Sequence, residues 1–85
     1  MNNSIILRLD QIIIRLSNGT LEPSELNDTT DLIVDAGFDS LSLVECIVEI
    51  EREFDFIFDD DYMEMEKLQS YSTIKNYVLS KVSEE

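Results

Sequence analysis

The amino-acid sequence predicts an all-α fold, a small four-helix bundle with a long loop between its first and second helices. Apolar residues recur at helical spacing in three well-separated segments of the chain. Between the first two segments, residues 20–39 lack this period and are rich in residues that favour turns. The chain has 85 residues, of which 44% are hydrophobic. This composition suffices for a single core, and we expect residues 1–85 to form one small domain.

The first helix is predicted over residues 4–17. Ser4 or Asn3 can cap its start, and Asn18-Gly19 supplies a left-handed stop after its end. The helical period places six aliphatic residues on one broad face. These are Ile5, Ile6, Leu9, Ile12, Ile13 and Leu16.

The connection over residues 20–39 is long for so small a domain, and such loops are often functional or pinned by their own apolar residues. Pro23 suits the first position of a short helical turn at residues 23–26. Gly37 permits a positive φ just before the next helix. The residues expected to pin the loop to the core are Leu21, Leu26, Leu32, Ile33 and Phe38.

The second helix is predicted over residues 40–54, with Asp39 as its N-cap. An ordinary surface helix has one apolar stripe, whereas this one has two. The first stripe, which we expect to be buried, contains Leu43, Cys46, Ile47, Ile50 and Phe54. The second lies on the opposite side, has a charged border and contains Leu41, Val44 and Val48.

Two further helices are expected in the C-terminal third of the chain. A short helix is predicted over residues 60–67, because the aspartates at residues 59–61 suit a helix N-terminus. Ser70 or Ser72 then opens the last helix, and residues 83–85 are expected to fray. The apolar residues at helical spacing in the last helix are Ile74, Tyr77, Val78 and Val82.

The charge balance is strongly acidic. Six basic and 19 acidic residues give a formal net charge of −13, which argues against binding to nucleic acid or to anionic lipid. Residues 39–66 contain 11 acidic residues and a single basic one, Arg52, a net charge of −10. Basic protein partners are the natural complement of this region.

The residue types that are missing exclude most catalytic and metal chemistry. The chain has no histidine and one cysteine, so it has no His-activated nucleophile, internal disulfide or thiolate metal cluster. That residue, Cys46, is interpreted as a small core residue. Residues 59–61 do not begin an EF-hand, because Glu64 and Ser70 stand where that motif needs glycine and glutamate. With no signal-peptide pattern or membrane-length apolar run, we expect a cytoplasmic protein that is not an enzyme and has no metal site.

The start of the second helix reads Gly37-Phe38-Asp39-Ser40-Leu41. Here the chain resembles the acyl carrier protein family, whose signature is Asp-Ser-Leu at the start of the second helix. The resemblance also covers the first helix, the approach to the motif and several later segments, at residues 31–38, 43–45, 49–51, 53–54 and 74–78. It implies a four-helix bundle of the acyl-carrier type.

The resemblance further implies that the hydroxyl of Ser40 receives a 4′-phosphopantetheine group from coenzyme A, with Asp39 and Leu41 completing the motif. A separate phosphopantetheinyl transferase would supply the base and the Mg²⁺ for this step. The thiol of the group would then carry an acyl chain as a thioester between enzymes. A phosphodiester in the first turn of a helix also lies where unpaired N–H groups favour an anion.

Six residues of the second helix are predicted to contact partner enzymes, which are the transferase, an acyl-loading ligase or transacylase, and synthase enzymes with basic docking surfaces. Scattered exposed apolar residues are normal on any surface, and glutamates on a helix usually form a solvated face. The position beside Ser40 and the regional charge favour docking by a monomeric carrier instead. The six residues are Leu41, Val44, Glu45, Val48, Glu49 and Glu51.

Some residues depart from the pattern of the family. Ser42 stands where many members have an acid, Arg52 interrupts an acidic run, and Asp59 replaces a common proline. These departures favour a specialised pathway, such as polyketide or lipopeptide biosynthesis, at least as much as housekeeping fatty-acid synthesis. A peptidyl or aminoacyl carrier usually has Gly-Gly before the variable residue and the serine, whereas this chain has Ala36-Gly37-Phe38-Asp39-Ser40. A non-carrying interaction module with the same fold is the other alternative.

Overall fold

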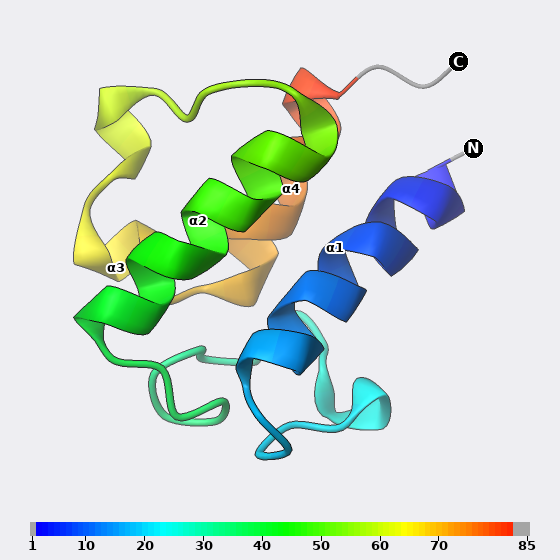
Figure 1. Ribbon diagram of the computed structural model, residues 1–85, viewed down its shortest axis with the longest axis vertical. Helices are drawn as coiled ribbons and strands as arrows, with labels where there is room; N and C mark the ends of the chain where they lie inside the picture. Colours follow the sequence, from blue (N-terminus) through cyan, green and yellow to red (C-terminus); the bar gives the residue numbers. More distant parts are fainter. Residues whose placement is uncertain (1, 83–85) are drawn as a thin grey trace.

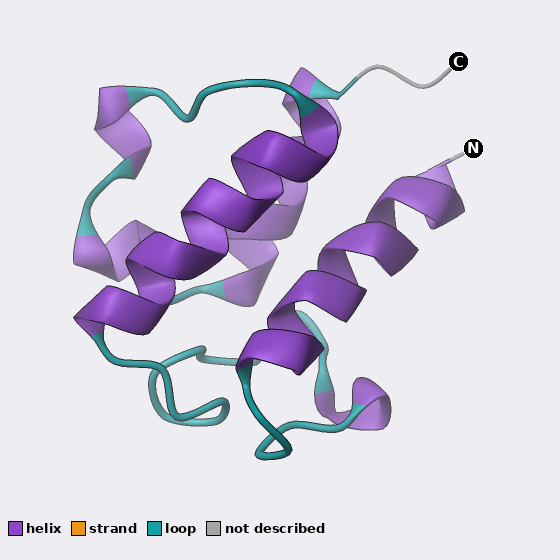
Figure 2. Ribbon diagram, in the orientation of Figure 1, coloured by secondary structure: helices purple, strands orange, loops and turns teal. Residues whose placement is uncertain are grey.

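Helices account for the regular secondary structure of residues 2–82, the part of the chain that the computed structural model describes, apart from one isolated β-bridge (Figure 2). The predicted all-α fold, with four helices and a long loop after the first, is confirmed within these residues. The predicted fraying of residues 83–85 lies outside them. The elements in chain order are α1 (Asn2–Leu16), the 3₁₀ turn η1 (Pro23–Glu25), α2 (Ser40–Phe54), the 3₁₀ turn η2 (Asp60–Tyr62), α3 (Met65–Leu68) and α4 (Tyr71–Lys81).

The core lies between α1, α2 and α4, and α1 runs antiparallel beside α2 (Figure 1). α1, α2 and α4 turn apolar faces to the core at the predicted spacing, although Ile6 is only half-buried. The fully buried side chains include Leu9, Ile13, Leu43, Ile47, Ile50, Ile74 and Val78. None of the helices formed by residues 2–82 is long and apolar enough to cross a membrane.

The start of α1 differs from the prediction. The helix begins at Asn2, so Asn3 and Ser4 lie within its first turn and do not cap it. The N–H groups of a first turn lack helical acceptors wherever the helix begins, so two more polar residues extend it at little cost. Its predicted end is confirmed, because Asn18 and Gly19 adopt φ values of 57° and 89°.

The long loop is pinned to the core as predicted. Leu21, Leu32 and Phe38 are buried, while Leu26 and Ile33 are half-buried against the core. The loop is also tied to the start of α4 by backbone hydrogen bonds, among them the 2.7 Å bond that Leu32 N donates to Gln69 O. The predicted short turn forms as η1. The loop therefore gives α2 a fixed starting point.

The single helix predicted over residues 60–67 is wrong: η2 and α3 replace it. Glu64 has extended backbone angles, φ −90° and ψ 144°, which break the helix. Tyr62 packs on Tyr77, with ring centroids 4.0 Å apart, and Leu68 is buried in the core. In one continuous helix these two side chains, six residues apart, would point about 120° apart around the axis. The break lets both reach the interior. After it, Ser70 rather than Ser72 caps α4, accepting a hydrogen bond from Thr73 N.

Candidate functional site

Ser40 is the first residue of α2 and is exposed to solvent. Gly37, at φ 75°, turns the chain toward the helix, and buried Phe38 anchors the turn by donating from its N–H to Leu32 O at 3.0 Å. Three residues beyond Ser40, Leu43 is buried in the core. The serine therefore stands exposed at a helix end that is anchored by a buried residue on either side.

Asp39 is the N-cap of α2, as predicted. Its backbone is extended, and its Oδ1 accepts a hydrogen bond of 2.8 Å from Ser42 N. This bond holds the pKa of the Asp39 carboxyl below its usual range. The Asp39 carboxylate, next to Ser40, is thus ionised at neutral pH and hydrogen-bonded to the backbone N–H of Ser42. It is poorly placed to act as a base toward the Ser40 hydroxyl, and the chain has no histidine for that task.

The start of α2 fits a covalently attached phosphodiester. The N–H groups of Ser40 and Leu41 belong to the first turn and have no acceptor within the helix. They and the helix dipole favour a negative charge at this end, and α2 is 15 residues long. Because Ser40 is exposed, a group bonded to its oxygen would extend into solvent.

The two apolar stripes of α2 are confirmed. The residues of the first stripe are all buried: Leu43, Cys46, Ile47, Ile50 and Phe54. Those of the second are exposed, Leu41 by 67%, Val44 by 47% and Val48 by 41%. Solvent-exposed aliphatic side chains thus follow Ser40 along the outward face of α2, where the sequence predicts partner contacts. That role stays a prediction.

The three acids assigned to partner contacts differ in their surroundings. Glu45 is exposed, whereas Glu49 and Glu51 are half-buried. The Glu49 carboxylate forms an ion pair of 3.4 Å with Arg15 of α1. Glu51 Oε2 accepts a hydrogen bond of 2.9 Å from Phe58 N and so holds the loop that follows α2. Part of the acidity that the sequence suggests for docking therefore serves the fold.

The structure also pairs residues that the sequence does not link. Arg8 of α1 donates from Nε to Glu53 Oε2 at 2.7 Å and from Nη2 to Glu53 O at 3.0 Å. Its guanidinium lies 4.7 Å from the centre of the Phe54 ring. No local signal predicts this contact, because the two residues are 45 positions apart. It joins the middle of α1 to the end of α2.

Cys46 is fully buried, and burial raises the pKa of its thiol to about 12. At neutral pH the group is a neutral thiol without access to solvent, so it is neither a nucleophile nor a metal ligand. This agrees with its interpretation as a core residue.

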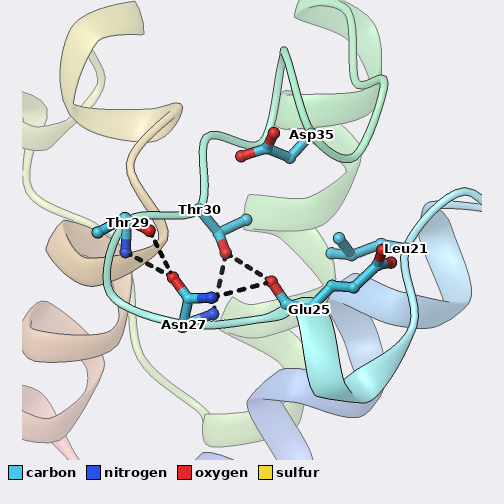
Figure 3. A pocket seen from close by; sticks show the side chains of 6 residues that line it. All are labelled: Leu21, Glu25, Asn27, Thr29, Thr30 and Asp35. Atoms are coloured by element: carbon cyan, nitrogen blue, oxygen red, sulfur yellow. Dashed lines mark hydrogen bonds between the residues drawn. The ribbon is translucent and has the colours of Figure 1, made fainter.

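A polar pocket of about 340 Å³ lies in the long loop, away from the residues predicted to act at the start of α2 (Figure 3). Its polar groups bond mainly to one another: Thr30 Oγ1 donates to Glu25 O at 2.9 Å and accepts from Asn27 N at 2.9 Å. Asp35 Oδ2 accepts from Asp31 N at 2.8 Å. The pocket is a product of how the loop folds and carries no functional assignment. It is lined by Leu21, Glu25, Asn27, Thr29, Thr30 and Asp35.

Comparison with known proteins gives the site its context. Residues 9–78 match the family described as "Phosphopantetheine attachment site". The chain is similar to an acyl carrier protein of Clostridium acetobutylicum, with 34% identity over 64 residues that cover 75% of this chain and 80% of that protein. It is 37% identical to an acyl carrier protein of Coprothermobacter proteolyticus over 59 residues, 69% of this chain and 66% of that protein. An acyl carrier protein of Karelsulcia muelleri is 33% identical over 76 residues, 89% of this chain and 87% of that protein.

Proposed function

Since this chain belongs to the acyl carrier protein family and is a carrier of acyl groups, we propose that it holds them on a 4′-phosphopantetheine arm attached to Ser40. The observation that carries the assignment is the position of this serine. It is exposed, it is the first residue of α2, and it lies within the matched residues 9–78. Bound there, the group supplies a terminal thiol that forms a thioester with the acyl chain.

The role of the chain is to present Ser40 and not to activate it. The Oγ of Ser40 would form the new bond to phosphorus as the diphosphate bond of coenzyme A breaks and adenosine 3′,5′-bisphosphate leaves, while the transferase takes the hydroxyl proton and holds Mg²⁺. Asp39 contributes by fixing the start of the helix, through its bond to Ser42 N. The first-turn N–H groups then face the new negative charge. Tethering raises the effective concentration of the acyl group at each successive enzyme, and this is the whole of the mechanism that we assign to the chain.

The setting of the proposal follows from the family and from the charge. Acyl carrier proteins are non-catalytic carriers that interact with synthases and transferases, and we propose that this chain is likewise not an enzyme. Its partners would be a phosphopantetheinyl transferase, an acyl-loading ligase or transacylase, and synthase enzymes with basic docking surfaces. We further propose that residues 1–85 form one carrier domain, which is a monomer in the cytoplasm. We also propose that it binds neither nucleic acid nor membrane, because a net charge of −13 is repelled by phosphates and by anionic lipid. The pathway is fatty-acid, polyketide or related specialised biosynthesis.

Intact-protein mass spectrometry tests the attachment. The purified chain is incubated with coenzyme A, Mg²⁺ and a broad-specificity phosphopantetheinyl transferase. We expect the wild type to gain the mass of one phosphopantetheine and Ser40→Ala to gain none. Ser42→Ala is the matched control, because it removes another hydroxyl from the same turn and should still be modified. Labelling that persists in Ser40→Ala would contradict the assignment, and an unmodified wild type would favour the non-carrying module.

A further inference from the structure

The outward face of α2 carries one continuous stripe that ends in a positive charge. Leu41, Val44, Val48 and Arg52 follow each other at intervals of three, four and four residues, and all four are exposed. At about 100° per residue they fall within an arc of about 80°. The arginine therefore extends the apolar stripe, on the side of the helix that faces away from the core.

The acidic residues near the end of this stripe form contacts within the fold, whereas its basic residue forms no ion pair within residues 4–82. Glu49, Glu51 and Glu53 are engaged with Arg15, Phe58 N and Arg8 respectively. Arg52 forms no ion pair with any group in residues 4–82, although it is the sole basic residue between positions 39 and 66. The acids of the C-terminal half of α2 are thus used within the fold, while its base is presented to solvent.

Glu45 provides the opposite charge on the same face. It is exposed and borders the stripe near its Ser40 end. Glu45 and Arg52 are seven positions apart, or about 10 Å along the helix axis, so the two are too far apart for an ion pair. From Ser40 onward, an enzyme that covers this face would meet Leu41 and Val44, then the negative charge of Glu45 beside the stripe, and finally the positive charge of Arg52 at its far end.

We propose that the phosphopantetheinyl transferase that modifies Ser40 docks on this stripe through a surface of mixed charge, with a basic side chain opposite Glu45 and an acidic side chain opposite Arg52. The inference rests on the proposed function and adds to it the kind of surface that the partner presents. The transferase is the occupant because it must bring coenzyme A to Ser40, at one end of the same helix. The positive charges with which the transferase holds the diphosphate of coenzyme A then lie near Glu45, toward the Ser40 end of the stripe.

We infer the acidic side chain of the transferase from the free-energy cost of burying the unpaired charge of Arg52. If the transferase covers Leu41, Val44 and Val48, Arg52 at the end of the stripe loses part of its hydration. A uniformly basic surface would add repulsion to that loss. A carboxylate offsets both costs and fixes the direction in which α2 lies on the enzyme. The alternative role for an arginine in the last turn, interaction with the helix dipole, needs no partner and predicts no effect on docking.

The test measures binding in a Ser40→Ala background, so that no chemistry takes place. The transferase of the source organism is titrated with the fluorescently labelled chain, and the Kd is read from anisotropy at low salt. We expect Arg52→Glu and Glu45→Lys each to weaken binding by about three- to ten-fold. Arg52→Lys, which keeps the charge, should stay within about two-fold of the parent. The control Lys81→Glu changes the net charge as Arg52→Glu does, but on α4, where it breaks only an exposed ion pair with Asp59, and it should have little effect on binding.

Each outcome decides the proposal. Tighter or unchanged binding by Arg52→Glu would show that the transferase surface is uniformly basic and would overturn it. If Lys81→Glu lost as much affinity as Arg52→Glu, net charge alone would explain the effect and the proposal would be wrong. A parent chain that does not bind would show that the transferase does not dock on this stripe. Circular dichroism verifies that each variant is helical. Near 1 M salt, where the Debye length is about 3 Å, the variants should converge. The mass gain of the wild-type chain reports on the attachment separately.

Discussion

Truncation of one residue on each face of α2 provides a direct test of the two stripes. Ile50 lies on the inner stripe and is 0% exposed, whereas Val48 lies on the outer stripe and is 41% exposed. Both are aliphatic, β-branched and in the middle of the same helix. Replacing each with alanine therefore removes similar chemistry from two different environments.

The structure predicts a large difference in the free energy of unfolding. Ile50→Ala leaves a cavity in the core and should cost about 2–5 kcal/mol. This is a major part of the roughly 4–13 kcal/mol expected for a domain of this size. Val48→Ala removes two methyl groups, each worth about 0.8 kcal/mol when fully buried, from a side chain that is largely in water. Alanine also has a higher helix propensity than valine by about 0.5 kcal/mol, so the net cost should be under about 1 kcal/mol.

Urea unfolding followed by far-UV circular dichroism measures both costs. At about 4–8 °C per kcal/mol, thermal melts should show a fall of at least about 8 °C for Ile50→Ala and a few degrees for Val48→Ala. The dependence of the unfolding free energy on urea should be unchanged in both, because the same surface becomes exposed. If the two variants lose equal stability, the assignment of Val48 to an outward face is wrong.

Two further predictions concern charge. The pKa of Asp39 is lowered by the Ser42 N–H bond, so its stabilising contribution is present above the unfolded-state value, about 3.8, and is lost as pH falls through the lower folded-state value. Asp39→Asn keeps the hydrogen-bond acceptor without the charge. In urea unfolding at pH 7 and pH 3, this variant should lose less stability on acidification than the wild type. An equal loss in the two proteins would show that the Asp39 charge is not the cause. The net charge of −13 should make NaCl or MgCl₂ raise the melting temperature, and a melting temperature indifferent to both salts would show that repulsion does not limit stability.

The sequence was sufficient to predict those features that depend on local geometry. The helical period identified α1, α2 and α4 and sorted the inner residues of α2 from the outer ones, because a helix fixes the direction of each side chain relative to its neighbours. The cap at Asp39, and Ser70 as one of two candidates for the cap of α4, followed from side-chain oxygens that can bond to N–H groups two or three residues later. The start of α2, which holds the candidate site, is defined by such local rules.

The features that could not be predicted depend on what lies opposite a given residue. The period places Glu49 and Glu51 on α2 but cannot show that Arg15, 34 positions from Glu49, and the N–H of Phe58 face them. The break between η2 and α3 has the same origin, since Tyr62 turns toward a ring on α4. In each case a contact distant in sequence competes with a local preference and prevails.

This division of the acids governs how docking on α2 is best tested. Reversing Glu45, Glu49 and Glu51 together would break the Arg15 ion pair and the bond to Phe58 N as well as alter the outward face. Slower modification of Ser40 could then arise from a loosened helix and not from weaker encounter with the transferase. Glu45 and Arg52 avoid this ambiguity, because both are exposed and neither forms an ion pair with another residue in 4–82. Reversal of their charges changes what a partner meets while leaving the contacts that hold α2 in place.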